Sequence, residues 1–334
     1  MVRKILVTGG AGFIGSHLVD KLIGEGFFVR VIDNFSTGRF ENLSHYIHDK
    51  HPRLEITRGD LKNSGDVQEA VKGIDVVFHF AANPEVRVST TNPKVHFDEN
   101  VLSTFNLLEA MREYEVREIV FASSSSVYGE PNSIPVDENS HIAPVSVYGA
   151  TKAACENLIH AYSRLYRIKA VILRYANVIG PRLRHGVIYD LLMKLSQNNR
   201  KLEVLGDGTQ IRSYIYIYDA VEATLIAWKN AVTYYDTYNI ASNDWIDVKT
   251  VVATLLDELG MRSVTIEYKP ILNGVGWPGD VKKIALDIRK IKELGFQPKL
   301  SSVEAVRVAV RRLAEELNLM FTNSNSSTRE IEIR

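Results

Sequence analysis

Tyr148 and Lys152 are the residues whose types and spacing best fit proton-transfer chemistry in this sequence. They are four residues apart in a segment with helical apolar spacing, so both should lie on one face of a helix. A tyrosine has an ordinary pKa of about 10, and lowering it by roughly 3 units requires about 4 kcal/mol. A nearby ammonium and an oxidised nicotinamide both favour the phenolate. The pair therefore predicts a general base with its charge partner, although two surface residues of a helix would show the same spacing.

A run of serines, Ser123 to Ser126, directly follows the apolar segment 119–122. If that segment is a strand of a parallel sheet, the hydroxyls lie at its carboxyl end, where open α/β sheets bind their ligands. A serine there can hydrogen-bond a substrate hydroxyl or carbonyl and relay a proton. A serine-rich turn is the alternative interpretation.

A glycine-rich segment, Thr8 to Gly15, stands between the apolar run 5–7 and a stretch with helical spacing. Gly9 allows a tight turn, Gly12 lets the backbone approach a pyrophosphate, and Gly15 lets a helix lie close to the strand. The N–H groups at the start of that helix would hold the anion. This context predicts a dinucleotide site.

Asp33 ends the second apolar run, 27–32. An acidic residue there, about 20 residues beyond the glycines, holds the ribose hydroxyls of NAD and would repel the extra phosphate of NADP. We therefore expect NAD as the cofactor, with the polar loop 35–39 beside the adenosine ribose. Asp60 could accept a hydrogen bond from the adenine amine, with Leu61 packed on the ring, or it could cap a helix.

The elements that must position these residues alternate between strands and helices. Apolar runs predict strands at 5–7, 27–32, 54–61, 76–82, 119–122 and 170–175, and helical spacing predicts helices after the glycines and at 67–71, 100–111 and 148–166. This alternation predicts an α/β fold with a doubly wound parallel sheet. His79 interrupts one of these apolar runs, and we expect it to be a hydrogen-bonded core residue.

Past residue 179 the pattern changes to helices at 187–195, 219–228, 248–259 and 303–317, with short strands between them. We expect an NAD-binding Rossmann domain over 1–178 and a smaller C-terminal α/β substrate-binding region over 179–320. Strands of the second region may interleave with the first. Residues 321–334 should form a frayed polar tail.

Composition limits the partners. The 334 residues include 40 Lys+Arg and 40 Asp+Glu, so the formal net charge is zero and bulk attraction to nucleic acid or an anionic membrane is not expected. The single Cys155 excludes an internal disulfide framework and a thiolate metal cluster. No signal peptide and no apolar segment of membrane-spanning length is visible. A cytoplasmic protein without a metal is therefore expected.

Together these motifs resemble those of the extended short-chain dehydrogenase/reductases, and within them the UDP-glucose 4-epimerase (UDP-galactose 4-epimerase) family. The resemblance reaches about residue 318 and includes Arg174–Val178, Gly206–Arg212 and Pro278–Asp280. It implies an NAD-dependent isomerase of galactose metabolism that interconverts UDP-glucose and UDP-galactose through a 4-keto sugar. It also implies a homodimer, paired through the helices at 100–111 and 148–166.

The resemblance further assigns roles to residues. Tyr148 is the implied base, Lys152 its partner and Ser124 the catalytic serine. The expected cofactor ligands are Gly9, Gly12, Phe13, Ile14, Asp33, Asn34, Ser36, Thr37, Gly38, Asp60, Leu61, Phe80, Ala81, Ala82, Asn100, Ala122, Tyr148, Lys152 and Tyr175. The expected UDP-sugar ligands are Ser124, Tyr148, Asn177, Val187, Val204, Leu205, Arg212 and Asp280, with Asn177 and Arg212 on the diphosphate and the aliphatic residues near the uracil.

The chain also departs from the family pattern. Trp277 stands where relatives often have a phosphate-binding arginine, a charge that Arg212, or Arg182 and Arg184, could supply. Pro84 replaces a frequent lysine. Ile284 stands where a tyrosine narrows the sugar pocket of some relatives, which would leave room for an N-acetyl group, although it could equally be a core residue.

Other functions remain open on the same fold. Another nucleotide-sugar epimerase is one alternative. A nucleotide-sugar dehydratase or decarboxylase is a second, but relatives of that kind carry an acidic residue beside the catalytic hydroxyl, and Ser124–Val127 contains none. A non-catalytic NAD-sensing regulator is the third, and such a protein would be expected to lose the Tyr148 and Lys152 pair.

Overall fold

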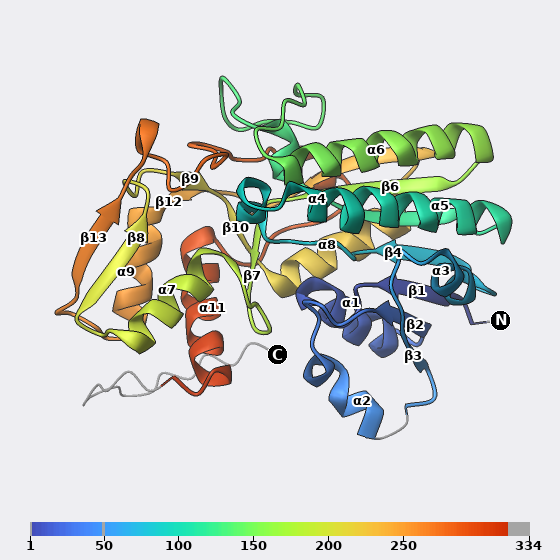
Figure 1. The fold of residues 1–334 in the computed structure, drawn as a ribbon, viewed down its shortest axis with the longest axis horizontal. Helices are drawn as coiled ribbons and strands as arrows, with labels where there is room; N and C mark the ends of the chain where they lie inside the picture. The colour runs from blue at the N-terminus through green and yellow to red at the C-terminus, as the bar shows by residue number, and fades with distance from the viewer. Residues whose placement is uncertain (1, 49–50, 320–334) are drawn as a thin grey trace.

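One parallel sheet with helices on both faces positions most of the predicted site residues (Figure 1). The structure is a computed structural model that describes residues 2–48 and 51–319; the predicted tail at 321–334 lies outside this part. The strands of the sheet are β1 (Lys4–Thr8), β2 (Phe28–Asp33), β3 (Leu54–Arg58), β4 (Val76–His79), β5 (Glu118–Ser124), β6 (Lys169–Tyr175) and β11 (Tyr235–Ile240). Its seven strands run in the order β11-β6-β5-β4-β1-β2-β3, and neighbouring strands are parallel.

The strand order reverses between β1 and β4, and open α/β sheets bind ligands at the carboxyl ends of strands at such a point. The predicted doubly wound Rossmann sheet is thus confirmed. Alternate residues of a strand point to opposite faces, so Ile5 packs in the core that holds Leu18 of α1, and Leu6 packs in the core that holds Leu107 of α5.

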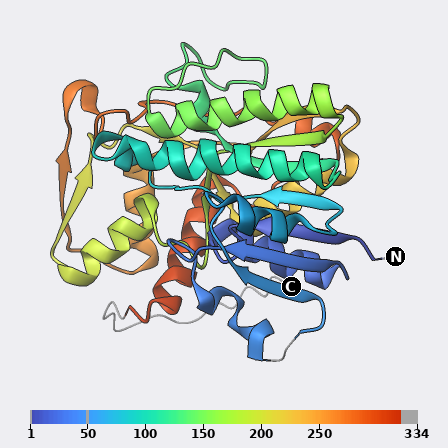
Figure 2. The same cartoon turned by 45° about the vertical axis from the view of Figure 1, so that its right-hand side comes forward.

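Helices cover both faces of this sheet. In Figure 2, α5 and α6 run side by side across one face of the sheet. On the opposite face, α1 and α8 pack against each other in the core that also holds Ile5. The helices of this part are α1 (Phe13–Gly24), α2 (Ser44–His48), α3 (Ser64–Val71), α4 (Pro93–His96), α5 (Ser103–Glu113), α6 (Val147–Tyr166), α8 (Ile217–Asn230) and α10 (Arg289–Glu293). Short 3₁₀ turns are η1 (Phe40–Leu43), η2 (Val86–Thr90), η4 (Ser125–Tyr128) and η5 (Leu272–Gly274).

The remaining elements form a smaller region beside the carboxyl edge of the sheet, at the left of Figure 1. Its helices are α7 (Gly186–Gln197), α9 (Val248–Glu258) and α11 (Ser302–Glu316). Its strand pairs are β7 (Asn177–Ile179) with β10 (Tyr214–Tyr216), β9 (Ile211–Arg212) with β12 (Ile246–Asp247), and β8 (Lys201–Leu205) with β13 (Thr265–Lys269). Between these elements the chain returns to the large sheet, because β11 pairs with β6.

Several bounds differ from the prediction: β3 ends at Arg58 rather than residue 61, β5 continues to Ser124, and two further differences affect the site. β4 ends at His79 rather than residue 82, because the next two N–H groups, of Phe80 and Ala81, both donate to the Thr8 hydroxyl at 3.2 Å. The helix predicted at 100–111 starts earlier, since α4 leads without a break into the π-helix η3 (Phe97–Leu102) and then into α5. The wider π-helical turn re-aims the side chains it carries, which is a known use of such turns.

His79 is the hydrogen-bonded core residue that the sequence predicts. Its Nδ1 lies 2.7 Å from the Thr8 hydroxyl and its Nε2 lies 2.9 Å from the Thr104 hydroxyl. Since Thr104 donates to the Asn100 carbonyl, Nε2 must donate to Thr104, and Nδ1 accepts from Thr8. Burial, helped by the charge of Lys152, lowers the pKa of His79 to about 3, so the ring is neutral and structural.

Two negative observations apply to the described residues alone. None of their helices is long and apolar enough to cross a membrane. No cluster of three or more His, Cys, Asp or Glu among them could hold a metal ion.

Candidate active site

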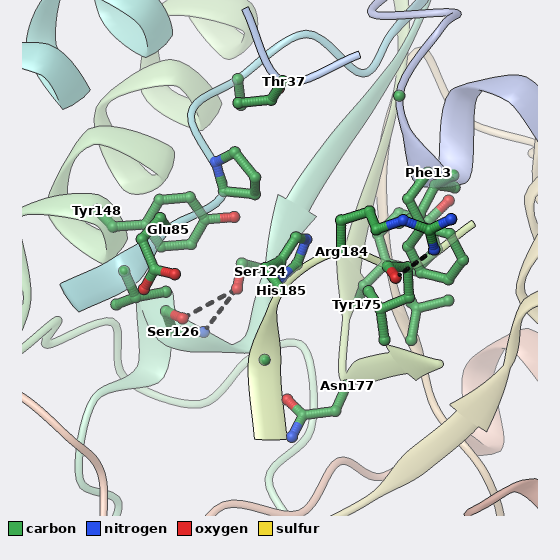
Figure 3. A pocket seen from close by; sticks show the side chains of 18 of the residues that line it. Phe13, Thr37, Glu85, Ser124, Ser126, Tyr148, Tyr175, Asn177, Arg184 and His185 are labelled. Atoms are coloured by element: carbon green, nitrogen blue, oxygen red, sulfur yellow. Dashed lines mark hydrogen bonds between the residues drawn. The ribbon is translucent and has the colours of Figure 1, made fainter. Parts of the chain in front are cut away.

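A cavity of about 530 Å³ opens at the carboxyl edge of the large sheet and continues beneath the smaller region. The glycine segment and the ends of β2, β4, β5 and β6 line one part, and residues of α7, β8 and β9 line the other. Figure 3 shows Tyr148 and Glu85 on one side of the cavity and Arg184 and Tyr175 on the other. Two ligands that meet inside the cavity, a dinucleotide in the first part and a second nucleotide in the other, fit this division.

The glycine segment makes the tight turn that the sequence predicts. Gly9 has a φ of +68°, and a Cβ there would lie 2.8 Å from the backbone of Ala81. A Cβ on Gly15 would lie 2.2 Å from the Gly9 carbonyl oxygen, so only glycine lets α1 start this close to β1. In this part of the described chain no side chain caps the start of α1, which leaves its first N–H groups for an anion. The segment therefore suits a pyrophosphate.

Asp33 lines the cavity at the end of β2. Its carboxylate accepts hydrogen bonds from the Ala11 N–H at 2.9 Å and the Phe35 N–H at 2.8 Å, which ties the glycine turn to the next loop. Burial raises the pKa of Asp33, and these two hydrogen bonds oppose the rise. A carboxylate has about four acceptor positions, so it can still accept from two ribose hydroxyls.

Tyr148 and Lys152 are brought together by the first turns of α6. Ser146 caps this helix by accepting the Gly149 N–H, so Tyr148 enters the cavity from the first turn. The Lys152 ammonium donates to the Ala122 carbonyl at 2.8 Å and lies 5.9 Å from the centre of the Tyr148 ring. Burial lowers the pKa of Lys152 to about 8.

The protein alone does not lower the pKa of Tyr148, contrary to the direction expected from its neighbours. Burial of the phenol raises this pKa to about 12, and the interaction with the Ser124 hydroxyl only partly opposes the rise. Burial therefore decides the direction of the shift. A second positive charge beside the phenol, such as an oxidised nicotinamide, is needed to make it a base.

The serine run divides between two roles. Ser124 caps η4, accepting the Ser126 N–H at 3.2 Å and donating to the Ser126 hydroxyl at 3.0 Å, and both hydroxyls face the cavity (Figure 3). The Ser123 hydroxyl instead donates to Glu156, which forms a buried ion pair with Arg174 at 2.7 Å. This ion pair was not expected from the sequence. Glu156 could have been suspected as a buried residue, because it comes four residues after Lys152 and so lies on the same face of the helix.

Asn100 is the expected site residue that does not line the cavity. It is buried in the π-helix, where its amide oxygen accepts the Asn83 N–H at 3.0 Å and its amide nitrogen donates to the Thr151 hydroxyl at 2.9 Å. The π-helical turn directs it toward the loop after β4 and α6, so it supports that loop from behind. The geometry therefore indicates a supporting role for Asn100 and no direct contact with the cofactor.

All the other expected cofactor and substrate residues line the cavity. At the substrate end, Arg212 forms an ion pair with Asp280 at 2.8 Å. Arg182 and Arg184 also line the cavity, paired with Asp20 and Glu316 respectively. A carboxylate thus fixes the position of each of these three arginines, and Trp277 and Pro84 also line the cavity.

Glu85, Arg87 and Asp190 form an ion cluster in the lining of the cavity, which was not expected from the sequence. His185, whose pKa is lowered by burial, lies in the same wall. Glu85 and Arg87 are two residues apart in one loop and could have been suspected, but Asp190 comes from a distant helix that nothing in the local sequence links to them.

Comparison with known proteins finds relatives along nearly the whole chain. Residues 5–241 match the model of the NAD dependent epimerase/dehydratase family. The chain is 41% identical over 315 residues to a putative UDP-glucose 4-epimerase of Methanocaldococcus jannaschii, covering 92% of this chain and 97% of the relative. It is similar to the crystal structure of a UDP-galactose 4-epimerase, with a TM-score of 0.84, 47% identity and coverage of 94% and 99%. It is also similar to the UDP-glucose 4-epimerase of Thermus thermophilus in complex with NAD, with a TM-score of 0.81, 32% identity and coverage of 92% and 98%.

Proposed function

The chain belongs to the NAD dependent epimerase/dehydratase family, and we propose that it is a UDP-glucose 4-epimerase that interconverts UDP-glucose and UDP-galactose with NAD as its cofactor. One observation carries the proposal: a single cavity joins the glycine turn and Asp33 to Tyr148, Ser124 and the arginine-lined substrate end. This arrangement supports a hydroxyl base between a dinucleotide site and a site for a second diphosphate.

The proposed chemistry assigns the proton to Tyr148. When bound, NAD supplies a two-electron acceptor and donor for C4 of the sugar. Tyr148 takes the proton of the 4-hydroxyl, Ser124 steadies that oxygen through its hydrogen bond, and Lys152 favours the phenolate by its charge. Arg212 and Asn177 would hold the diphosphate while the 4-keto sugar rotates, C4 would then take its hydride back on the opposite face, and Tyr148 would return the proton to the 4-oxygen.

The cavity favours oxidation and reduction over elimination or decarboxylation. Ser124, Ser125 and Ser126 place no carboxyl beside the catalytic hydroxyl. Glu85 is an acid of the same wall, but both of its oxygens bind the Arg87 guanidinium, at 2.9 and 3.0 Å. These bonds lower the pKa of Glu85, so it is an occupied carboxylate rather than a free acid. A regulator without catalysis is disfavoured because Tyr148 and Lys152 both face the cavity.

A panel of UDP-sugars tests this function. Purified protein should convert UDP-galactose to UDP-glucose and the reverse, with the products separated by chromatography. Formation of a 4-keto-6-deoxy sugar would identify a dehydratase and release of CO₂ from UDP-glucuronate a decarboxylase, and either would contradict the proposal. No conversion of any sugar, with NAD bound, would support the regulator instead.

Replacing Asp33 by asparagine should reduce the preference for NAD. Ala11 and Phe35 donate to different oxygens of Asp33, so the asparagine, with one acceptor oxygen, can hold only one of the two N–H groups and the loop should loosen for both cofactors alike. One charged hydrogen bond to the ribose is lost, and the ratio of NAD to NADP affinity should fall about tenfold or more. Titration of both cofactors measures this ratio, with Asp60→Asn as the control. Equal use of both cofactors by the wild type would refute the role of Asp33.

Ile284 should set the range of sugars. Its side chain is 7% exposed and lines the cavity, so it touches both the core and the site. The wild type should accept the N-acetylhexosamine pair as well as the plain pair, and Ile284→Tyr should suppress the former more strongly, because the phenol fills space. Assays of both pairs, with Ile284→Leu as the volume-matched control, decide the question. An equal loss of activity on both sugar pairs would mean that Ile284 only packs in the core and does not select the sugar.

A homodimer through α5 and α6 is part of the proposal. Phe97, Leu102 and Phe105 are exposed on the η3–α5 helix, and Leu165 and Tyr166 are exposed on α6. Exposed apolar side chains along two neighbouring helices support an interface between two copies. The cytoplasmic location and the lack of nucleic-acid or membrane partners stay predictions from the sequence.

A further inference from the structure

The loop after β4, from Asn83 to Ser89, is linked by hydrogen bonds to α6 at both of its ends. Ser89 of η2 accepts the backbone N–H of Tyr148 at 3.2 Å. At the other end, the Asn83 N–H donates to Asn100, and Asn100 donates to Thr151, which lies three residues beyond Tyr148 in α6. Any movement of this loop therefore acts on the first turn of α6, where the base sits.

Arg87 projects from this loop between two carboxylates. Glu85 caps η2 and binds the guanidinium through two parallel hydrogen bonds, which fixes its plane. The third nitrogen, Nη1, lies 3.1 Å from the Asp190 carboxylate. Asp190 belongs to α7, one turn after Val187, which is expected to lie near the uracil. Arg87 thus joins the loop of the base to the helix of the nucleotide across the wall of one cavity.

The ion pair between Arg87 and Asp190 is weak enough to form and break as the cavity closes and opens. Arg87 and Asp190 keep 40% and 32% of their side chains exposed, and such pairs are weak because water screens them. The pair can therefore break when a UDP-sugar enters or leaves. While it is formed, the loop beside Tyr148 and the helix α7 are held together across the cavity.

From this path of contacts we propose that Arg87 is a positioning residue that, by bridging to Asp190, holds the cavity closed over the sugar during its oxidised stage. The inference rests on the proposed epimerase function, which requires the 4-keto sugar to rotate inside the cavity without leaving it. In oxidation, C4 gives a hydride to NAD and the 4-hydroxyl gives its proton to Tyr148. If the ketone escapes before reduction, one reduced nicotinamide stays on the enzyme for each ketone released.

The test compares holoenzymes carrying Arg87→Gln or Asp190→Asn with the wild type, each incubated with UDP-galactose. Three quantities are followed: epimerisation, the absorbance of reduced nicotinamide, and the 4-keto sugar trapped in the filtrate. Both variants should release about three- to tenfold more ketone per turnover, as expected for loss of one partly exposed charged contact. Their rates should decline as reduced enzyme accumulates, and Asp190→Glu, which keeps the charge, should restore retention.

Asp257→Asn is the matched control, since it breaks an exposed ion pair with Arg307 between α9 and α11 and does not line the cavity. It should retain the ketone like the wild type. Unchanged ketone release in both Arg87→Gln and Asp190→Asn, beside an active wild type, overturns the bridge alone. A wild type that converts no UDP-sugar overturns the epimerase function and the bridge with it.

Discussion

Tyr148→Phe should lower kcat about 10²- to 10⁴-fold while UDP-sugar and NAD still bind nearly normally, since a positioned general base contributes a factor of this size. The substitution keeps the ring, which packs edge-on against His96 with centres 5.6 Å apart. It removes only the hydroxyl that meets Ser124. The hydroxyl acts in the chemical step and adds little to the binding of the substrate. Its loss should therefore lower kcat and leave KM nearly unchanged.

Steady-state kinetics and a binding titration measure this effect. Tyr162→Phe is the control, as Tyr162 lies on the same helix and its hydroxyl donates to Glu109 of α5, away from the cavity. That variant should keep its activity. Ser124→Ala should lose less than Tyr148→Phe, because it removes a hydrogen bond and not the base. A Tyr148→Phe protein with nearly wild-type kcat would show that the base has been assigned to the wrong residue.

Gly15→Ala should weaken NAD binding about ten- to hundredfold and destabilise the fold. The added Cβ would lie 2.2 Å from the Gly9 carbonyl oxygen and 3.0 Å from the Gly10 Cα. These are backbone atoms of a tight turn, so α1 must move away from β1. Overpacking of this kind costs about 1–3 kcal/mol, and it displaces the N–H groups that would hold the pyrophosphate.

The same helix provides the control for this prediction. Gly24 ends α1, and a Cβ there meets no atom within 4 Å. Gly24→Ala should leave NAD binding unchanged and leave stability equal or higher by up to about 1 kcal/mol, since alanine has less freedom to lose on folding. Thermal unfolding and NAD titration of the two variants provide the comparison. Similar behaviour of the two would mean that the turn tolerates a side chain.

Short-range patterns explain why so much of the fold and of the cavity wall could be predicted. The glycine turn, Asp33 and the Tyr148–Lys152 pair are defined by spacing along one strand, loop or helix, and spacing is visible in a sequence. Their presence in one cavity follows from the parallel sheet, since the carboxyl ends of its strands meet at one edge.

Contacts between distant segments could not be predicted in the same way. Asn100 faces the loop after β4 because a π-helical turn rotates it, and no local pattern signals that turn. The partners of Arg182 and Arg184 come from α1 and α11, far away in the chain. The raised pKa of Tyr148 reflects the burial of its phenol, which Ser124 opposes only in part, and the extent of burial is not visible in a sequence.

The central claim is that this cavity removes hydrogen from C4 of the sugar and returns the same hydrogen to the opposite face. UDP-galactose labelled with deuterium at C4, incubated with the wild-type protein in ordinary water, tests it most directly by mass spectrometry and NMR of the product. We expect UDP-glucose that retains the deuterium at C4. UDP-glucose with protium at C4, or no UDP-glucose at all from NAD-bound protein, would contradict it.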